Sequence, residues 1–392
     1  MSQPVCVQVN WQRQIGGGEI YTRFFTRALR ELGWQVRLIV DRRAKFWSRL
    51  GMAQSELITF DHSSEIATLI PQHASVVVTQ TVLPADMAQP IAARFALGGF
   101  VHMPMDGRRL QGLAHYKAIF PVSEYVRQTL LRQGYAQVLP WAMLGIADLE
   151  PQAAPTGLPV RNSEFDWDRR KFRDRMLSWI EPLRYRGQLA FEKKPGVTIG
   201  LVSRLTPIKQ FPLMFTLLLP VLQRYPQVNI EVFGAGGYAS VRDLKQVLAP
   251  LGERVRFWGF QPDPALIYPQ LDFVLSGLPE REALGLNLIE AQVMGTPVLA
   301  VRAAPFDETV IDGVSGYFFT DPRADGAKDF ERLLAWLCSD RHAALATALL
   351  TESAAQHLAQ FSASAFRVRV QNAMQYLLRS QAPSQPWTTP RK

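Results

Sequence analysis

Short apolar runs alternate along the chain with segments in which apolar residues recur every three or four positions. This alternation is typical of strand and helix units whose strands form a parallel sheet. In the first half, residues 5–9 predict a buried strand, and Gly16-Gly17-Gly18 leads into a helix that ends at Gly33. Further strands in this half are predicted at residues 36–40, 75–78, 99–102, 119–122 and 137–139.

A second series of the same kind starts at residue 197. It comprises strands at 197–202, 228–233, 254–258, 271–275, 297–301 and 317–319, helices at 211–224 and 241–248, and a helix that carries Glu290. Both halves therefore read as Rossmann-like α/β domains with parallel sheets.

The predicted organisation has five parts. Residues 1–150 form the first Rossmann-like domain, and residues 197–360 form the second. Residues 151–196, rich in proline and charge, form an interdomain connection with a small helical insertion. We expect a helix at residues 361–380 to pack back toward the first domain, and a disordered tail at 381–392.

Composition narrows the class of protein. With 392 residues, 47% hydrophobic and 20% charged, the chain is typical of a two-domain α/β protein. The two cysteines, Cys6 and Cys338, suggest neither a disulfide framework nor a zinc site. The N-terminus lacks the pattern of a secretory signal, and no apolar run is long enough to span a bilayer, so we expect a cytoplasmic protein.

The formal net charge of +9 comes almost entirely from residues 1–195. No interleaved aromatic and basic motif supports binding to nucleic acid, and we expect none. Peripheral contact with an anionic membrane, an acidic acceptor, and solvated basic helices without a partner all explain the asymmetry.

Two carboxylates provide the most informative motif. Glu282 and Glu290 lie eight positions apart, around Leu284-Gly285-Leu286. The backbone amides that open a helix bind anions, so a diphosphate fits on this loop. Glu290 would then hold a ribose diol, and Glu282 a sugar hydroxyl. The competing interpretation is that both are solvated helix-start residues; it is weaker for Glu290, which enters an apolar face.

Two cations follow the strand that opens the second half. Arg204 and Lys209 lie at the carboxyl edge of the predicted sheet, where α/β proteins bind ligands. Such cations can neutralise a departing diphosphate. Taken alone, they are equally compatible with surface charge.

Glycines and one histidine complete the candidates. Gly17 and Gly18 precede a helix, and Gly234 ends a strand, so the backbone at each place can approach a ligand closely. His102 ends a predicted strand and is suited to hydrogen-bond a sugar ring. Ordinary turns and a structural histidine are the alternatives, and no side chain stands out as a general base.

These motifs resemble those of retaining glycosyltransferases of the GT-B architecture, closest to glycosyltransferase family 4. The resemblance implies two facing Rossmann-like domains with a cleft between them. It assigns Glu282 to the donor sugar, Gly285 and Leu286 to the phosphates, and Glu290 to the ribose. The family usually has Gly-Phe where this chain has Ala283-Leu284.

The resemblance extends to the Gly-Arg-Leu-x-x-x-Lys-Gly motif. Arg204 and Lys209 match it, whereas Ser203 and Gln210 replace its glycines. Gly17, Gly18 and Gly234 resemble the family's glycine loops, and a histidine is often found at the place of His102.

The resemblance implies transfer of a sugar, with retention, from a nucleotide diphosphate-sugar to a glycan or lipid-linked acceptor. We expect the reaction to need no metal or other cofactor, since no Asp-x-Asp element stands in a suitable loop. Synthesis of lipopolysaccharide, another cell-surface polysaccharide or a glycolipid, at the inner face of the membrane, is the expected setting. Another GT-B enzyme, such as a sugar-nucleotide epimerase or a phosphorylase, and a non-catalytic nucleotide-sugar-binding protein remain alternatives.

Overall fold

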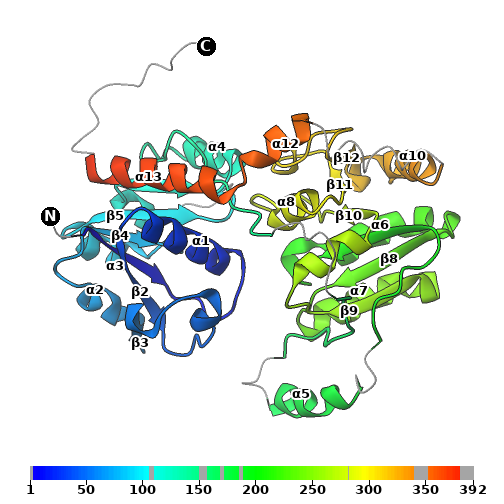
Figure 1. Cartoon of the computed structure of the whole chain (residues 1–392), viewed down its shortest axis with the longest axis horizontal. Coiled ribbons are helices and arrows are strands. Elements are labelled where there is room, and N and C mark those ends of the chain that lie inside the picture. The colour runs from blue at the N-terminus through cyan, green and yellow to red at the C-terminus, as the bar shows by residue number, and fades with distance from the viewer. Residues whose placement is uncertain are drawn as a thin grey trace. The chain divides into compact units, whose positions relative to one another are not determined.

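The computed structural model describes residues 3–105, 110–149, 157–167, 172–184, 189–280, 282–339 and 352–379 (Figure 1). Internal contacts divide the chain into two compact units, an N-terminal unit formed by Met1–Gly145 with Ala363–Lys392, and a C-terminal unit formed by Ile146–Ser362. The boundaries predicted at 150 and 360 lie close to these divisions. The tail predicted at 381–392 lies outside the described residues.

The N-terminal unit contains a six-stranded sheet in which every pairing is parallel, in the order β3-β2-β1-β4-β5-β6. Its strands are β1 Val5–Asn10, β2 Gln35–Asp41, β3 Leu57–Phe60, β4 Val76–Thr79, β5 Ala96–Val101 and β6 Ala118–Pro121. Its helices are α1 Gly17–Glu31, α2 Ile66–Leu69, α3 Ala85–Ala92, α4 Glu124–Arg132 and α13 Ala363–Arg379.

The C-terminal helix belongs to the N-terminal unit. α13 packs against α1, β5 and β6. Leu377 lies so close to β5 that a Cβ on Gly98 would stand 3.0 Å from it. Arg367 of the same helix forms an ion pair with Glu31 at 3.3 Å. The chain therefore returns to its first sheet after completing the C-terminal unit.

The C-terminal unit repeats the architecture with the sheet order β12-β11-β10-β7-β8-β9, also fully parallel. Its strands are β7 Val197–Val202, β8 Val228–Phe233, β9 Val255–Gly259, β10 Phe273–Leu275, β11 Val298–Val301 and β12 Gly316–Phe319. Its helices are α5 Phe172–Arg184, α6 Phe211–Arg224, α7 Tyr238–Leu248, α8 Leu286–Val293, α9 Pro322–Asp325, α10 Lys328–Leu337 and α12 Glu352–Ala359.

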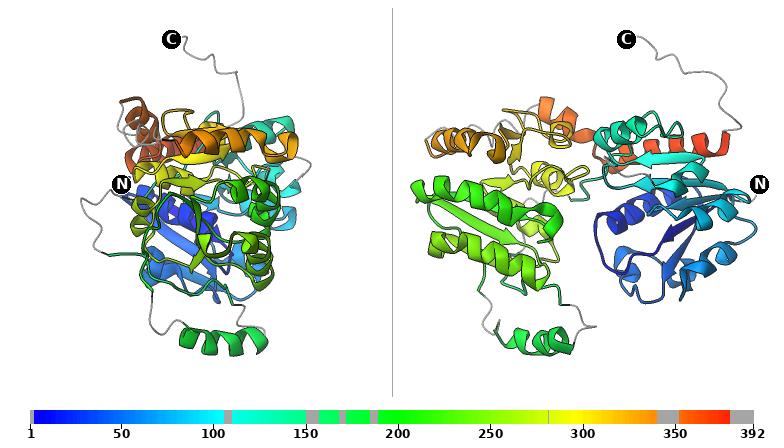
Figure 2. Two further views of the ribbon diagram at one scale, coloured as in Figure 1. Left: turned by 90° about the vertical axis from the view of Figure 1, so that its right-hand side faces the viewer. Right: turned by 180° about the vertical axis from the view of Figure 1, so that it is seen from behind.

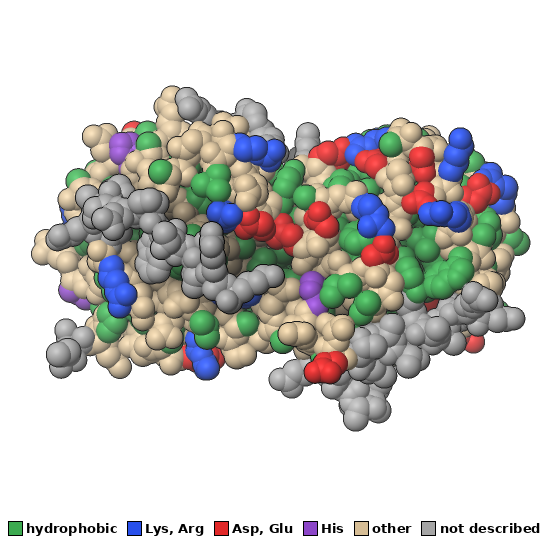
Figure 3. Space-filling view, turned by 90° about the horizontal axis from the view of Figure 1, so that it is seen from above, with side chains coloured by type: hydrophobic (Ala, Val, Ile, Leu, Met, Phe, Trp, Pro, Cys, Tyr) green, Lys and Arg blue, Asp and Glu red, His purple; other side chains and the backbone are tan. Residues whose placement is uncertain are grey.

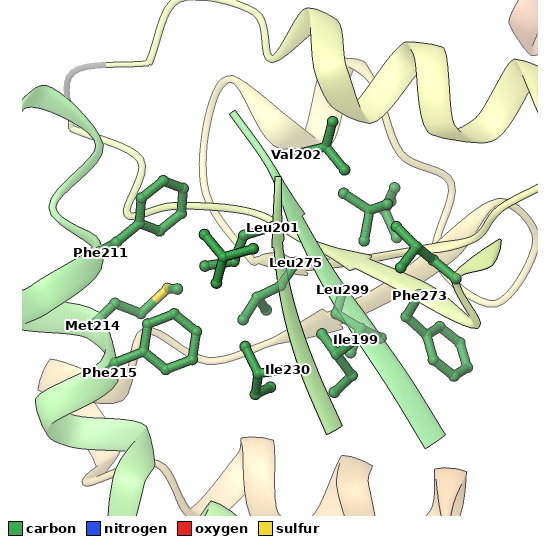
Figure 4. Packing of buried hydrophobic residues seen from close by; sticks show 14 of the residues in the cluster. Ile199, Leu201, Val202, Phe211, Met214, Phe215, Ile230, Phe273, Leu275 and Leu299 are labelled. Carbon is green, nitrogen blue, oxygen red and sulfur yellow. The ribbon is translucent and has the colours of Figure 1, made fainter. Parts of the chain in front are cut away.

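Burial on both faces explains why the strands read as continuous apolar runs. Every residue of β7 and β8 is buried. Phe211, Met214 and Phe215 of α6 point toward Leu201 and Ile230 of these strands (Figure 4). This core supports the loops that follow β7, β8 and β10, which carry most of the candidate residues.

The predicted α/β class is confirmed, with two differences in detail. Residues 137–139 form no strand within the described stretch 110–149; Val138 makes only an isolated bridge to Ile119. The sequence analysis missed β3, because this edge strand is four residues long and three of them are only partly buried. None of the described helices is both long and apolar enough to cross a membrane.

Residues 157–167, expected to connect the two halves, run along the C-terminal unit. Val160 bridges Ala190, and Phe165 bridges Gly236 in the loop after β8. The helical insertion expected between residues 151 and 196 is α5 (Figure 2).

Candidate functional site

Most of the residues predicted to bind the donor lie at the carboxyl edge of the C-terminal sheet, whereas Gly17 and Gly18, also predicted to bind it, belong to the N-terminal unit. The loop after β7 packs on the glycine turn after β8, where the Leu205 amide donates to the carbonyl of Ala235 at 2.9 Å. Gly234 has φ +143°, and a Cβ there would stand 1.9 Å from the carbonyl oxygen of Ser203. Only glycine fits, so Gly234 allows the two loops to meet.

Lys209 forms an ion pair with Glu282. The two side chains are only 21% and 16% exposed, although they lie 73 positions apart in the sequence. Gly277, in the loop after β10, brings these segments together, because a Cβ there would stand 2.8 Å from the Lys209 carbonyl oxygen. The structure thus joins the lysine of one predicted motif to the first glutamate of the other.

Gln210 takes the place of the glycine that ends the Gly-Arg-Leu-x-x-x-Lys-Gly motif, and the loop after β7 nevertheless has a backbone conformation typical of glycine there. Gln210 has φ 52° and ψ 26°, the left-handed conformation that favours glycine. Its side-chain amide donates to Glu280 at 3.5 Å. The backbone is therefore left-handed at Gln210 despite the strain that a side chain causes there, and Lys209 still pairs with Glu282.

The helix α8 begins at a second left-handed residue. Gly285 has φ 82° and ψ 54° and is the N-cap of α8. Leu284, the residue before Gly285, anchors this turn through its buried side chain. The first amides of a helix, here those of Leu286 and Asn287, have no acceptor within the helix and lie at the positive end of its dipole. This turn is therefore suited to bind an anion.

Glu290 lies one turn inside α8 and accepts a hydrogen bond from the hydroxyl of Tyr268 at 2.8 Å. The pKa of Glu290 is raised to about 7, chiefly by burial; the Tyr268 hydrogen bond lowers it, and the neighbouring charge of Asp148 adds a smaller increase. Tyr268 itself is fully buried. Glu290 is thus held in one orientation and lies near its point of half-ionisation at neutral pH.

Arg204 takes a different position from Lys209, although both lie on the loop after β7. Its guanidinium stands 4.0 Å from the carboxylate of Asp166, and both side chains are about half exposed. Asp166 belongs to the segment expected to be an interdomain connection, and its amide donates to the carbonyl of Gly236 at 2.8 Å.

Three candidates of the N-terminal unit form a separate group. His102 lies over the start of α1, where a Cβ on Gly18 would be 3.7 Å from its ring. No atom lies within 4 Å of the corresponding position at Gly17. The ring stacks on Phe100 and meets Tyr21 edge-on, with centroids 5.6 and 5.0 Å apart. Burial lowers the pKa of His102 to about 4, so the ring is neutral at pH 7.

A chain of neutral side chains holds His102. Its Nε2 lies 3.3 Å from the side-chain oxygen of Gln80, whose amide donates to Gln8 at 3.2 Å. Gln8 in turn donates to the hydroxyl of Thr26 on α1 at 2.6 Å. The ring orientation is thereby linked to the strands and to the helix that follows the glycines.

The sequence analysis missed several of these supporting residues. Tyr268, Asp148 and Asp166 lie outside the motifs that drew attention, and Gln80 follows a strand without any neighbouring motif. The one available signal was the place of Gln80 directly after an apolar run, at the carboxyl edge where ligands bind.

The sequence pattern of the family Glycosyl transferases group 1 matches residues 196–340. This segment of the C-terminal unit is therefore similar to a group 1 glycosyltransferase domain. The D-inositol 3-phosphate glycosyltransferase of Corynebacterium urealyticum is 32% identical over 176 residues, or 42% of this chain and 39% of that protein. The protein of the same name from Mycobacterium marinum is 33% identical over 173 residues, or 42% of this chain and 35% of that protein. The chain therefore matches less than half the length of these relatives.

The structural likeness is wider than the sequence match. The crystal structure of Anabaena Alr3699/HepE in complex with UDP and glucose aligns with 94% of this chain and 99% of its own, with a TM-score of 0.69 at 17% identity. The likeness includes the N-terminal unit as well as residues 196–340, and the predicted GT-B fold is confirmed. The assignment to family 4 stays a prediction.

Proposed function

We propose that the protein is a retaining glycosyltransferase that moves a sugar from a nucleotide diphosphate-sugar to a hydroxyl of a glycan or lipid-linked acceptor. The observation that carries the proposal is the Lys209–Glu282 ion pair beside the left-handed Gly285 that starts α8. It combines a cation, a carboxylate and helix amides at one edge of the sheet, as a diphosphate-sugar requires.

In the proposed reaction the diphosphate lies on the amides that open α8. Lys209 leaves Glu282 to contact the phosphate, which frees the carboxylate to accept hydrogen bonds from sugar hydroxyls. Arg204, half exposed on the same loop, supplies a second positive charge. These groups stabilise the charge that grows on the phosphate as the bond from the anomeric carbon to the phosphate oxygen breaks.

The acceptor oxygen then forms its bond to the anomeric carbon on the face that the phosphate leaves. Its proton passes to the departing phosphate oxygen, so the configuration is retained and no protein base is needed. We propose that Glu290, oriented by Tyr268, accepts hydrogen bonds from the ribose diol. We also propose that the reaction needs no metal, since Lys209, Arg204 and the amides supply the positive charge.

The nucleotide and acceptor are proposed from the similar proteins. HepE was crystallised with UDP and glucose, which makes UDP-sugars the first donors to test. The D-inositol 3-phosphate glycosyltransferases support a polyhydroxylated, phosphate-bearing acceptor as one choice. For the setting, we propose synthesis of lipopolysaccharide, another surface polysaccharide or a glycolipid in the cytoplasm, at the inner face of the membrane. The basic excess of residues 1–195 supports contact with an anionic membrane.

The test combines binding with turnover. Thermal shifts with UDP, GDP, ADP and their sugar conjugates would identify the donor, since a ligand of the folded state raises the apparent stability. Release of nucleotide from that donor, with and without a chelator, would measure turnover and its need for metal. The configuration of the product, followed by NMR, would test retention. If no donor of any kind binds or is cleaved, the proposed function is wrong.

A further inference from the structure

The helix α5 exposes large apolar side chains to solvent. Phe172, Met176, Trp179 and Ile180 are 69%, 47%, 78% and 49% exposed. Their spacing of three and four positions places them on one face of the helix. The sequence analysis expected a small helix here and assigned it no role.

Two polar side chains of α5, those of Glu181 and Arg173, contact other parts of the C-terminal unit. The carboxylate of Glu181 is buried and accepts a hydrogen bond from the indole of Trp167. The guanidinium of Arg173 lies over the ring of Tyr238 on α7, 5.0 Å from its centroid. In an ordinary surface helix the apolar face packs on the body of the protein and the polar face meets water. These contacts hold α5, while its four large apolar side chains remain exposed. The helix lies apart from the sheet (Figure 2).

The charged side chain described beside the apolar face of α5 is positive. Arg175 is exposed, and its guanidinium stands 5.5 Å from the centroid of the Phe172 ring. The two acidic residues of the helix are the buried Glu181 and the partly buried Asp174. By contrast, acidic and basic side chains are interspersed on the surface of the C-terminal unit seen in Figure 3. Exposed aromatic residues beside arginines match an interface between hydrocarbon and anionic headgroups.

We propose that α5 binds the surface of an anionic lipid bilayer. Phe172, Met176, Trp179 and Ile180 enter the boundary between headgroups and acyl chains, and the exposed Arg175 binds a lipid phosphate. The helix is too short to span a bilayer and lies along its surface. This inference deepens the membrane contact in the proposed function, yet it depends on no residue of the donor site.

The experiment is sedimentation of the full-length protein with vesicles of phosphatidylcholine, alone or mixed with phosphatidylglycerol. Wild type is expected to bind the anionic vesicles, and less strongly as salt concentration rises. The double variant Phe172→Ser/Trp179→Ser should bind about tenfold more weakly or worse, since it loses two aromatic side chains from the interface. Arg175→Gln should weaken binding to anionic vesicles only.

The matched control is Val368→Ser/Leu378→Ser on α13, where both side chains are about half exposed. It should bind vesicles like wild type. Nucleotide-induced thermal shifts should be the same in all these variants, so failure of the donor site and failure of membrane binding are distinguishable. The inference is overturned if wild type ignores anionic vesicles or if the α5 double variant binds them unchanged. It is also overturned if α5 proves to mediate self-association of the lipid-free protein, which would make a second copy its partner.

Discussion

The candidate residues of the two units differ in charge. In the C-terminal unit, Lys209 and Glu282 form an ion pair at the carboxyl edge of the sheet. In the N-terminal unit, His102 and Gln80 lie in a chain of neutral hydrogen bonds. Formal charge is suited to an anionic diphosphate, whereas neutral donors and acceptors are suited to hydroxyl groups. This difference agrees with the diphosphate site proposed for the C-terminal unit and with the predicted hydrogen bond from His102 to a sugar.

Burial favours the uncharged form of one titratable side chain in each unit, Glu290 and His102. It raises the pKa of Glu290 to about 7 and lowers the pKa of His102 to about 4. Near neutral pH His102 therefore stays uncharged, whereas the charge of Glu290 changes with small shifts in pH or with a bound ligand. Glu290, which titrates near pH 7, therefore lies in the same C-terminal unit as the Lys209–Glu282 ion pair.

The largest expected effect comes from removing the cation. Lys209→Ala should lower turnover by about a hundredfold to a thousandfold, because a charge that stabilises the departing phosphate is lost. Nucleotide release under donor saturation measures the effect. Lys193→Ala is the matched control, since Lys193 also pairs with an acidic residue of this unit, Asp272, at 2.7 Å. The control should change turnover by less than about twofold. Equal effects of the two substitutions would contradict the assigned role of Lys209.

The glycines of the two units should differ in their tolerance of a side chain. Gly234→Ala should destabilise the protein by about 3 kcal/mol or more, because the new Cβ would meet the Ser203 carbonyl oxygen in a left-handed backbone. Gly17→Ala should change stability by less than about 1 kcal/mol, since it has space and begins a helix. Urea unfolding measures both. A tolerant Gly234 would show that the loops after β7 and β8 do not need to meet.

The pH dependence of stability should have opposite directions in the two units. The Glu290 carboxyl keeps its proton to about pH 7 when folded, but ionises near its ordinary value of 4.5 when unfolded. Between these values the folded state binds more protons, so stability falls as pH rises. Relative to Glu290→Gln, wild type should lose up to about 3 kcal/mol across this window and change no further above it. Urea unfolding at a series of pH values measures the difference.

For His102 the stability should change in the opposite direction, falling as pH falls. The unfolded imidazole takes up a proton near its ordinary value of 6.5, whereas the folded ring resists protonation until about pH 4. Wild type should therefore lose stability relative to His102→Gln as pH falls from 6.5 toward 4. If both variants shift the pH profile in the same direction, burial does not control the two groups as described.

Local patterns in the sequence predicted most of the fold, because strands buried on both faces must be apolar along their length. The helix at 211–224 and the strands at 197–202 and 228–233 have the predicted bounds. The sequence motifs also identified Lys209 and Glu282 as candidate site residues. Their direct pairing was not predictable, because it depends on how closely Gly277 approaches Lys209. The roles of Tyr268 and Gln80 likewise depend on tertiary packing that leaves no periodic trace.

Gln210 provides the smallest and most local test. It occupies a left-handed conformation without being glycine, next to the lysine of the ion pair. Gln210→Gly should stabilise the protein by at most about 1 kcal/mol, because relief of backbone strain is offset by the greater entropy of glycine in the unfolded chain. The exposed hydrogen bond to Glu280 is long at 3.5 Å, so its loss costs little. Thermal unfolding measures the stability, and nucleotide release should stay within about twofold of wild type. A marked fall in turnover without loss of stability would show that the Gln210 side chain, and not only the backbone it holds, contributes to presenting Lys209.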